Sequence, residues 1–528
     1  MTHAQEQIVC DLLVIGGGIN GVGIARDAAG RGLSVVLCEK DDLAAHTSSA
    51  SSKLIHGGLR YLEQYAFALV RKALIEREVL LRLAPHIIRP LRFVMPHDAG
   101  QRPAWLIRAG LFLYDALARR ELLAGSAVLA LDGHAAGTPL KRHFRRGFLY
   151  SDAWVDDARL VVLNAIDAAE RGARILTRTT CTALERGTDH WCASLHERTG
   201  RRTSVRARCL VNAAGPWAAQ LHQMASARAA PQTLRLIKGS HIVVRRLFAH
   251  DDAYIFQHPD GRIVFAIPYE REFTLIGTTD LDYSGDVDTV RISDAEVRYL
   301  CELVNRYFAQ PIGTADVVWS YAGVRPLVEN QAGAASKITR DYRLERDSGT
   351  DSGGGITGAP MLTVFGGKIT TYRKLAEEAL DWIAATLGCA APAWSAHACL
   401  PGGDPFGVGP SARGVLEFDA YVATLQRRYR WLAPALVARY ARAYGTRIDC
   451  LLAGRASVPD MGAEIAAGLY AAEVDYLVAH EWARCAADIL WRRSKLGLHL
   501  PPGAEPQLDT WLRQHHPHDA QNEAQHDT

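Results

Sequence analysis

Residues 8–39, IVCDLLVIGGGINGVGIARDAAGRGLSVVLCE, decide the fold class of this 528-residue chain. The apolar run IVCDLLVI predicts a buried strand, and IARDAAGRG after the glycines predicts a helix that ends at Gly30 and Gly32. LSVVLCE then predicts a second strand. A strand, a helix and a strand in this order predict a parallel sheet covered by helices, which is the α/β class.

A glycine-rich turn joins the first strand to the helix. Gly16, Gly18 and Gly21 fit the pattern GxGxxG, in which helix amides hold a pyrophosphate. Such a turn on its own also serves tight packing. Glu39, at the end of the second strand, adds an acid that accepts hydrogen bonds from an adenosine ribose. The two features together predict a Rossmann-type dinucleotide site.

Two further strands that end in small residues bear on the choice between FAD and NAD. The stretch CLVNAAG ends at Gly215, and MLTVFGGKITT places Gly367 before a predicted helix start. Close approach of a backbone to a ligand requires such residues. Three glycine-terminated strands within the first 370 residues favour an extended FAD over a compact NAD site.

Composition limits the classes of partner. Lys plus Arg total 60 against 57 for Asp plus Glu, so the net charge of +3 gives no case for nucleic-acid binding. The ten cysteines show no CxxC pair and no Cys/His ligand spacing, so we expect reduced thiols and no metal site. The first apolar run is too short for a signal peptide, and no stretch reaches the roughly 18 apolar residues of a membrane-spanning helix. We therefore expect a cytoplasmic protein that meets a membrane from one face.

The sequence pattern changes along the chain and predicts several domains. Between His241 and Gly277, short β-rich runs predict an antiparallel sheet. After about residue 400 helical spacing replaces the strand pattern. We expect an FAD-binding domain interleaved with a substrate-binding domain over residues 8–400, with the substrate sheet at roughly 235–340, then a helical domain at 401–510 and a disordered tail at 511–528.

The run TSSASSKLIHGGLRYL, residues 47–62, resembles the FAD-dependent glycerol-3-phosphate dehydrogenases of aerobic respiration. RLIKGSHIVV, IGTTD, YAGVRPL, ITRDY and VFGGKITTYRKLAE also resemble that family, and the similarity extends from near residue 10 to about residue 500. The resemblance implies an FAD domain, an antiparallel substrate domain and a helical cap. It also implies oxidation of sn-glycerol 3-phosphate to dihydroxyacetone phosphate by hydride transfer to non-covalently bound FAD, with electrons passed to ubiquinone or menaquinone at the cytoplasmic face of the membrane.

The matching motifs assign further cofactor-binding residues. These are Ser51, Ser52, His56 and Gly57 in the first run, and Lys368, Ile369 and Thr370 after Gly367. Lys368 follows two glycines, where a cation stabilises negative charge on a reduced flavin or orients the substrate. His46 precedes the first run; some flavoproteins carry FAD covalently on such a histidine, but we interpret His46 as an exposed loop residue.

Binding of a phosphate dianion calls for planar guanidinium forks. Within the matching motifs, Arg325 in GVRP and Arg340 in ITRD are the predicted phosphate ligands, whereas Arg60 and Tyr61 are assigned to the substrate's oxygen end beside the flavin. Thr278 adds a hydroxyl to the same pocket. An arginine more often forms an ordinary ion pair, and only the motif match favours a site.

Oxidation of a secondary carbinol needs a base for the hydroxyl proton. His241 in KGSHIVV is the leading candidate, and His56 is its competitor. The alternative for His241 is a buried histidine that only begins a strand. With His241 as base, we expect His241, Arg325 and Lys368 to form the catalytic group.

Residues 102–120 predict an amphipathic helix. Trp105, Phe112 and Leu113 share an apolar face, whereas Arg108 and Arg119 belong to a polar stripe. Such a helix lies at a membrane interface or packs on the core, and residues 373–387 form a second candidate. Two alternatives to a quinone-linked dehydrogenase stay open at this point: an oxidase that uses oxygen and a non-catalytic flavin-binding protein. The oligomeric state also stays open, with a homodimer as one candidate.

Overall fold

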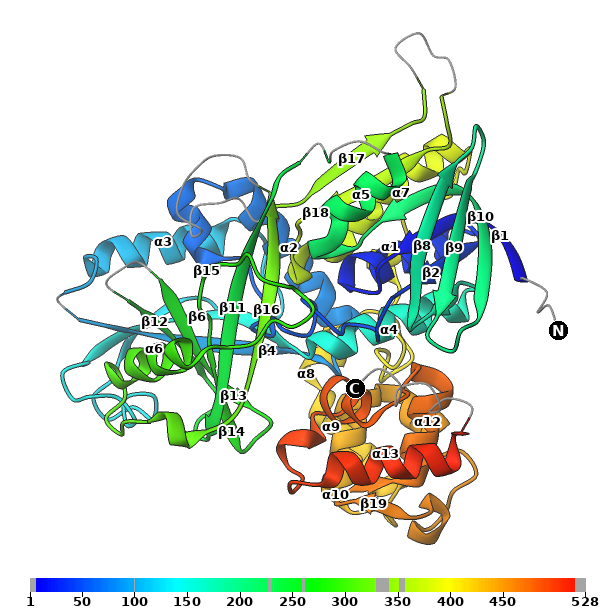
Figure 1. Cartoon of the computed structure of the whole chain (residues 1–528). Coiled ribbons are helices and arrows are strands. Elements are labelled where there is room, and N and C mark those ends of the chain that lie inside the picture. The colour runs from blue at the N-terminus through cyan, green and yellow to red at the C-terminus, as the bar shows by residue number, and fades with distance from the viewer. Residues whose placement is uncertain are drawn as a thin grey trace.

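The computed structural model contains two large β-sheets and a helical C-terminal domain (Figure 1). The two sheets lie side by side, and the C-terminal domain, gold to red in Figure 1, lies below the right-hand sheet and beside the lower end of the left-hand one. The structure describes residues 6–98, 100–226, 230, 232–258, 262–328, 341–350 and 357–517.

The first sheet has eight strands with a parallel centre, which confirms the expected α/β class. Its parallel strands are, in spatial order, β18 (Met361–Phe365), β10 (Arg202–Asn212), β1 (Glu6–Ile15), β2 (Val35–Cys38) and β7 (Arg174–Leu176). The antiparallel additions are β17 (Arg343–Asp347), β8 (Thr179–Arg186) and β9 (Trp191–Glu197).

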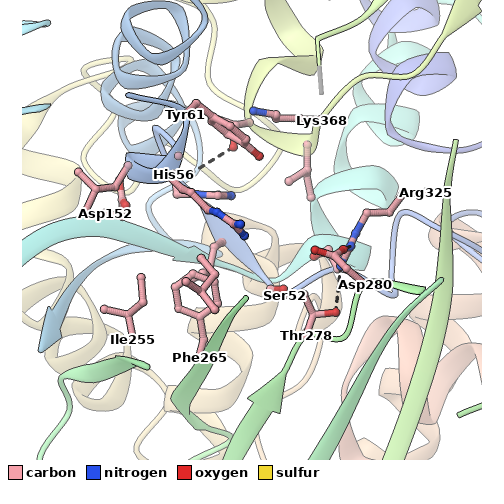
Figure 2. A pocket seen from close by; sticks show the side chains of 18 of the residues that line it. Ser52, His56, Tyr61, Asp152, Ile255, Phe265, Thr278, Asp280, Arg325 and Lys368 are labelled. Carbon is pink, nitrogen blue, oxygen red and sulfur yellow. Dashed lines mark hydrogen bonds and ion pairs between the residues drawn. The ribbon is translucent and has the colours of Figure 1, made fainter. Parts of the chain in front are cut away.

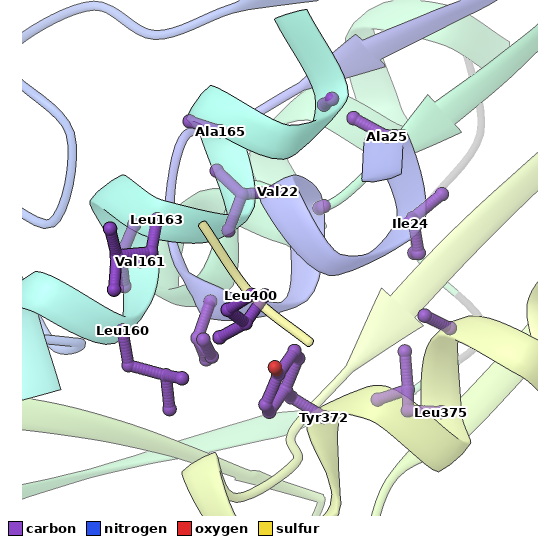
Figure 3. Close-up of a cluster of buried hydrophobic side chains, with 14 of the residues drawn as sticks. Val22, Ile24, Ala25, Leu160, Val161, Leu163, Ala165, Tyr372, Leu375 and Leu400 are labelled. Carbon is purple, nitrogen blue, oxygen red and sulfur yellow. The ribbon is translucent and has the colours of Figure 1, made fainter. Parts of the chain in front are cut away.

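Three helices pack together beside this sheet: α1 (Ile19–Gly30), α4 (Asp157–Glu170) and α7 (Tyr372–Leu387). Figure 3 shows Val22 of α1 near the α4 side chains and Tyr372 of α7 in the same core. Gly23 permits this close packing, because a Cβ there would lie 2.8 Å from the Tyr372 ring. The amino end of α1 is thereby fixed at the ends of the parallel strands.

The second sheet has ten strands, in the order β15-β11-β14-β13-β12-β4-β6-β3, with β16 added on β11 and β5 on β6. The strands from the later segment are β11 (Leu234–Arg245), β12 (Ala253–Gln257), β13 (Ile263–Tyr269), β14 (Phe273–Gly277), β15 (Leu281–Asp282) and β16 (Val317–Val328). Those from the earlier segment are β3 (Leu54–Ile55), β4 (Ile88–His97), β5 (Ala127–Ala130) and β6 (Arg146–Val155).

The expected limits of this sheet, roughly 235–340, were too narrow. Four strands come from residues 54–155, and β12 pairs with β4 in parallel, so the sheet is not purely antiparallel. The physical reason is that β12 would otherwise be an exposed edge with unpaired backbone groups, which β4 covers. Further helices are α2 (Phe67–Leu83), α3 (Ala104–Ala116), α5 (Ala218–Ser226) and α6 (Asp294–Asn305).

The C-terminal domain is mainly helical, as expected. It contains α8 (Ala412–Leu416), α9 (Phe418–Arg428), α10 (Pro434–Tyr444), α11 (Ile448–Leu451), α12 (Ala471–Glu481) and α13 (Ala504–His515), with a small hairpin of β19 (Glu464–Ala466) and β20 (Leu469–Tyr470). We expected a disordered tail from residue 511 onward. This start was wrong, because α13 continues to His515 and buries Leu512 in the domain core. Residues 518–528 lie outside the described part of the chain.

Buried ion pairs join the C-terminal domain to the FAD-type domain. Arg159 of α4 pairs with Glu481 at the end of α12, and Arg493 pairs with Asp42. All four side chains are almost fully inaccessible to solvent. Removal of one partner would leave an uncompensated buried charge, which costs about 3–5 kcal/mol. The domain is therefore fixed against the rest of the molecule.

Candidate active site

A cavity of about 1000 Å³ is lined by residues of both sheets. This volume is at the upper end of ligand pockets, which measure about 300–1000 Å³. Its wall includes Gly18 from the first glycine turn, Ser52 from the run 47–62, Arg325 of β16 and Gly367 after β18. Figure 2 shows that the labelled side chains approach it from several sides, with Lys368 and Tyr61 opposite Thr278. Segments far apart in the sequence thus form one site.

The three glycines of the first turn have different surroundings. A Cβ on Gly16 would lie 2.5 Å from the Ala213 carbonyl oxygen, and one on Gly21 would lie 1.9 Å from the Gly16 carbonyl oxygen. Neither residue lines the cavity, whereas Gly18 does, and a Cβ there would lie 3.1 Å from Ser48 Oγ. Gly16 and Gly21 therefore allow backbone packing, and Gly18 is the position at which a ligand can approach the backbone.

The Glu39 carboxylate lies beneath the same turn and accepts two backbone hydrogen bonds. Gly17 N donates to Oε2 at 2.6 Å, and Asp41 N donates to Oε1 at 2.9 Å. The Glu39 side chain is buried and is not among the residues that line the cavity, so its contact with a ribose stays a prediction. His46 contacts Asp41 at 2.7 Å from Nε2 to Oδ2 and is not among the residues that line the cavity.

Residues of the run 47–62 form one wall of the cavity, and hydrogen bonds to Asp157 fix this wall. Ser51 Oγ donates to Asp157 Oδ2 at 2.7 Å, and Lys53 Nζ donates to Asp157 Oδ1 at 2.8 Å. Ser51, Ser52 and His56 line the cavity. The predicted cofactor residue Gly57 does not; a Cβ there would lie 2.6 Å from both Leu74 and the Tyr114 hydroxyl. Close packing explains this glycine without a ligand.

The strand β18 ends at a second glycine pair that faces the cavity. Gly366 and Gly367 have φ values of +73° and +103°, in the region that favours glycine. Gly367, Lys368, Ile369 and Thr370 line the cavity, as does Gly215 after β10. His56 N donates to Thr370 Oγ1 at 3.2 Å. This bond ties the glycine pair to the run 47–62.

Lys368 and Tyr61 form a pair on the cavity wall. The Lys368 ammonium lies 3.8 Å from the centroid of the Tyr61 ring, in cation–π contact. Tyr61 is only 6% exposed, and Arg60 beside it also lines the cavity. The structure thus brings these three predicted residues to one wall, which Figure 2 shows for Lys368 and Tyr61.

His241 lies behind the cavity wall, not on it. The imidazole is 1% exposed, and its Nε2 lies 2.9 Å from Ser52 Oγ, which does line the cavity. A Cβ on the neighbouring Gly277 would lie 2.0 Å from the imidazole Cδ2, so this glycine makes room for it. Burial, and then the charges of Arg325 and Lys53, hold the pKa of His241 well below its ordinary value. The ring is therefore neutral, as a base must be.

Arg325 of β16 reaches the cavity across β11. Its Nη2 donates to Thr278 Oγ1 at 2.9 Å, and its Nη1 donates to Asp280 Oδ1. A Cβ on Gly239 would lie 2.3 Å from Nη2, so only glycine leaves space for this side chain. The predicted pair of Arg325 and Thr278 is in contact, whereas the second predicted phosphate ligand, Arg340, lies outside the described residues.

Three residues of the site were not singled out from the sequence. Asp280 fixes the Arg325 guanidinium and ends the quoted stretch IGTTD, so its position in a matching motif was the available signal. Asp152 lines the cavity, binds Arg77 and accepts a hydrogen bond from the Tyr114 hydroxyl at 2.8 Å. Burial raises the pKa of Asp152, which Arg77 counteracts. Tyr321 stacks on His241 and had no signal beyond its place in YAGVRPL.

The cavity walls fit FAD. Gly18 leaves the first turn open to a pyrophosphate, and the backbone at Gly366 and Gly367 is exposed to the cavity without side chains. Lys368 brings a positive charge to the same wall. The cavity extends from the first turn past His56, which suits a long cofactor better than a mononucleotide.

Two family models match the chain. Residues 11–373 match the model described as FAD dependent oxidoreductase, and residues 395–509 match the model described as the C-terminal domain of alpha-glycerophosphate oxidase. Together they account for most of the chain, including both sheets and the C-terminal domain.

Similar proteins cover nearly the whole chain. A glycerol-3-phosphate dehydrogenase of Pseudomonas aeruginosa is 54% identical over 97% of this chain and 96% of that protein. A D-erythritol 1-phosphate dehydrogenase of Brucella abortus is 47% identical over 96% of this chain and 98% of that protein. The crystal structure of a glycerol-3-phosphate dehydrogenase from Bacillus halodurans with FAD has a TM-score of 0.76 at 25% identity, and covers 99% of this chain and 93% of that chain.

Proposed function

Because the chain belongs to the FAD-dependent oxidoreductase family and carries the C-terminal domain of alpha-glycerophosphate oxidase, we propose that it oxidises sn-glycerol 3-phosphate to dihydroxyacetone phosphate. Bound FAD supplies the hydride acceptor for this reaction. The observation that carries the proposal is the position of Arg325 beside the Ser52–His241 pair, on neighbouring strands at one cavity. An anion-binding guanidinium and a neutral base are the two groups that a phosphorylated alcohol requires.

Arg325 binds the phosphate in this proposal. Asp280 and Thr278 hold its guanidinium in one plane, which suits bidentate contact with phosphate oxygens. Arg340 is proposed as the second phosphate ligand. Arg60 and Tyr61 hold the oxygen end of the substrate, and Lys368 stabilises negative charge near the flavin position.

The Ser52–His241 pair accepts the proton of the substrate hydroxyl. Ser52 Oγ takes the proton from the substrate oxygen as its own proton passes to His241 Nε2, over the 2.9 Å contact that joins the two. The pair therefore acts as one base, although His241 itself is buried. His56 lines the cavity directly and remains the competing base.

A phosphorylated tetritol is a second candidate substrate. A relative named for D-erythritol 1-phosphate is 47% identical, close to the 54% of a relative named for glycerol 3-phosphate. The cavity also continues to Gln257 and His258, which offer hydrogen bonds to further hydroxyl groups. The two candidate substrates are compared by steady-state kinetics with an artificial electron acceptor. Rates are measured with glycerol 3-phosphate, with erythritol 1-phosphate and with glycerol. Equal rates with glycerol would contradict both candidates.

A membrane quinone is the proposed electron acceptor. The cavity reaches Asp98, Gln101 and Arg102, which lead directly into α3. On α3, Trp105 is 72% exposed and Phe112 is 67% exposed, whereas Leu111 and Tyr114 on the other side of the same helix are buried in the core. These features support an interfacial helix beside a route to the cavity. In the described part of the chain, no helix is long and apolar enough to cross a bilayer.

The second membrane candidate, residues 373–387, packs its apolar side chains in the interior. This segment belongs to α7, where Arg373, Leu375 and Leu380 are buried in the FAD-type domain. Its charged side chains form internal ion pairs, such as that of Arg373 with Glu76. We therefore propose peripheral binding to the cytoplasmic face of the membrane through α3 alone.

Oxygen is the alternative electron acceptor. The C-terminal family model takes its name from an oxidase, so the match by itself favours neither acceptor. A dehydrogenase passes electrons to a quinone analogue and releases little peroxide, whereas an oxidase releases one peroxide for each substrate molecule oxidised. Measurement of peroxide in air-saturated buffer separates the two reactions. Stoichiometric peroxide would contradict the quinone proposal.

A further inference from the structure

A row of aromatic rings in contact runs from the C-terminal domain to His241, with two stacked pairs and a tilted Trp319–Tyr321 contact between them. The Trp491 ring lies on the Trp319 ring of β16, with centroids 4.4 Å apart and an interplanar angle of 8°. Trp319 contacts Tyr321 at 5.1 Å, and Tyr321 is stacked on the His241 imidazole at 4.7 Å and 13°. Aromatic pairs attract at centroid separations of about 4.5–7 Å, and the three contacts lie within this range or at its lower limit.

The geometry of β16 explains why these rings line up with the site. Side chains two positions apart in a strand point to the same face, so Trp319, Tyr321 and Arg325 share one face of β16. In the antiparallel pairing with β11, Tyr321 lies opposite His241. A shift of the Trp319 ring therefore acts first on Tyr321, the ring that packs on the imidazole.

Tyr321 is fixed to the cavity wall as well as to the imidazole. Its hydroxyl donates to the Ser51 carbonyl oxygen at 2.7 Å, one residue before Ser52. Tyr321 thus contacts His241 through its ring and the residue before Ser52 through its hydroxyl. This arrangement sets the direction of the 2.9 Å contact between Ser52 Oγ and His241 Nε2.

A second link from the C-terminal domain ends at Ser51, the residue before Ser52. Lys495 Nζ donates to Asp156 Oδ1 at 3.3 Å, and the next residue, Asp157, accepts a hydrogen bond from Ser51 Oγ at 2.7 Å. Lys495 is only 3% exposed, so the contact is an interior one. Two separate contacts of the C-terminal domain therefore converge on Ser51 and Ser52.

We propose that Trp491 of the C-terminal domain is a positioning residue for the oxidation step, because its stack on Trp319 holds Tyr321 and the Ser52–His241 pair in register. This role rests on the proposed function and extends it, since it makes the C-terminal domain part of the catalytic arrangement. Trp491 is not among the residues that line the cavity. Its loss should lower the rate of the chemical step and leave phosphate binding at Arg325 and FAD binding unchanged.

The test compares Trp491→Ala, Trp491→Phe and wild-type holoenzyme in anaerobic flavin reduction by glycerol 3-phosphate. Misplacement of a reacting group by about 1 Å can cost about 100-fold in rate, so we expect a loss of about tenfold or more in Trp491→Ala. The apparent dissociation constant for substrate and the FAD content should stay within about twofold of wild type. Trp491→Phe keeps a ring on Trp319 and should restore the rate to within about threefold.

A matched control is available in the same domain. Trp511 stacks on His515 at 4.3 Å and 10°, but both belong to α13 and not to the row that reaches β16. Trp511→Ala should reduce its flavin at the wild-type rate. A slow Trp511→Ala would overturn the proposal, because loss of any ring in the domain would then suffice.

Double substitution tests the row itself. Trp319→Ala should be as slow as Trp491→Ala, and the double variant should be no slower than either, because the two rings act as one unit. Three results would each overturn the positioning role. They are additive rate losses in the double variant, a wild-type rate of flavin reduction in Trp491→Ala, and a loss of substrate affinity in Trp491→Ala equal to its loss of rate. If wild-type flavin is not reduced by any phosphorylated polyol, the proposed function has failed instead.

Discussion

The Arg325 guanidinium passes directly over Gly239, where a Cβ would lie 2.3 Å from Nη2 and 2.7 Å from Cζ. Hydrogen bonds to Asp280 and Thr278 hold the guanidinium in this position. The position of the proposed phosphate ligand therefore depends on a residue without a side chain on the neighbouring strand. Two matching stretches, RLIKGSHIVV and YAGVRPL, are linked by this contact.

Gly239→Ala should raise the apparent KM for glycerol 3-phosphate by about tenfold or more, because a charge-assisted hydrogen bond is worth about 1.5–3 kcal/mol. FAD content should stay at the wild-type level, because Gly239 does not line the cofactor end of the cavity. Gly313→Ala is the control, since the nearest atom to a Cβ there is Asp316 Oδ2 at 3.9 Å. Steady-state kinetics and flavin absorbance measure both variants; an unchanged KM in Gly239→Ala would refute the assignment of Arg325.

Arg325→Lys should retain FAD and also show a raised apparent KM for glycerol 3-phosphate. A lysine restores the charge but not the planar fork that binds two phosphate oxygens. Plain glycerol should be a very poor substrate for the wild type, since it leaves the guanidinium without its anion. The ratio of kcat/KM for the two substrates is the measurement. If neither Arg325→Lys nor Arg340→Lys loses discrimination, the phosphate binds elsewhere.

His86 should make the protein less stable in acid. Burial lowers the pKa of His86 to about 3 from its ordinary 6.5, and within the described residues neither ring nitrogen has a hydrogen-bond partner. Between pH 6.5 and about 3, His86 is therefore protonated in the unfolded chain but not in the folded chain. The free energy of unfolding falls as pH falls through this window.

His86→Leu should remove this contribution. Its free energy of unfolding should fall less steeply below pH 6.5, by up to about 1.4 kcal/mol per pH unit relative to wild type. Stability at pH 7 should change little, because an apolar group replaces an unsatisfied polar one. Urea unfolding at several pH values tests this. Identical slopes for the two proteins would show that His86 is solvated or paired in the native state.

Binding to anionic vesicles should depend on α3. Arg108 and Arg119 are exposed at or just after this helix, beside the exposed Trp105 and Phe112. Replacing both arginines by Glu should reduce co-sedimentation with anionic vesicles, and salt should weaken binding of the wild type. Leu416→Ala is the control, because Leu416 is 66% exposed on α8 of the other domain. Unchanged binding of the double Glu variant would exclude α3 as the anchor.

The first glycine turn and its strands could be predicted from the sequence because their signals are local. The apolar run, the GxGxxG turn and Glu39 follow one another within residues 8–39, and each indicates a nucleotide-binding βαβ unit for its own physical reason. The helical C-terminal domain was predicted for a similar reason, from side-chain spacing. The pairing of β12 with β4 could not be predicted, because strand neighbours distant in sequence leave no local signal.

The site could be predicted only in part. Arg325, Lys368 and Tyr61 lie in matching motifs, and the structure brings all three to the cavity. The separation of His241 from the cavity by Ser52 depends on tertiary packing, as does the stack of Trp491 on Trp319. Neither contact is local in sequence, so residue type and spacing alone give no sign of it. Gly57 shows the opposite case, a motif residue that the structure explains by packing.

Anaerobic addition of glycerol 3-phosphate to the purified holoenzyme tests the central claim most directly. The account predicts that the visible flavin absorbance is lost with one dihydroxyacetone phosphate formed per FAD, and that a quinone analogue then restores it without peroxide. Plain glycerol at the same concentration should leave the flavin oxidised. Flavin that stays oxidised with glycerol 3-phosphate, or is reduced equally well by glycerol, would contradict the proposed reaction.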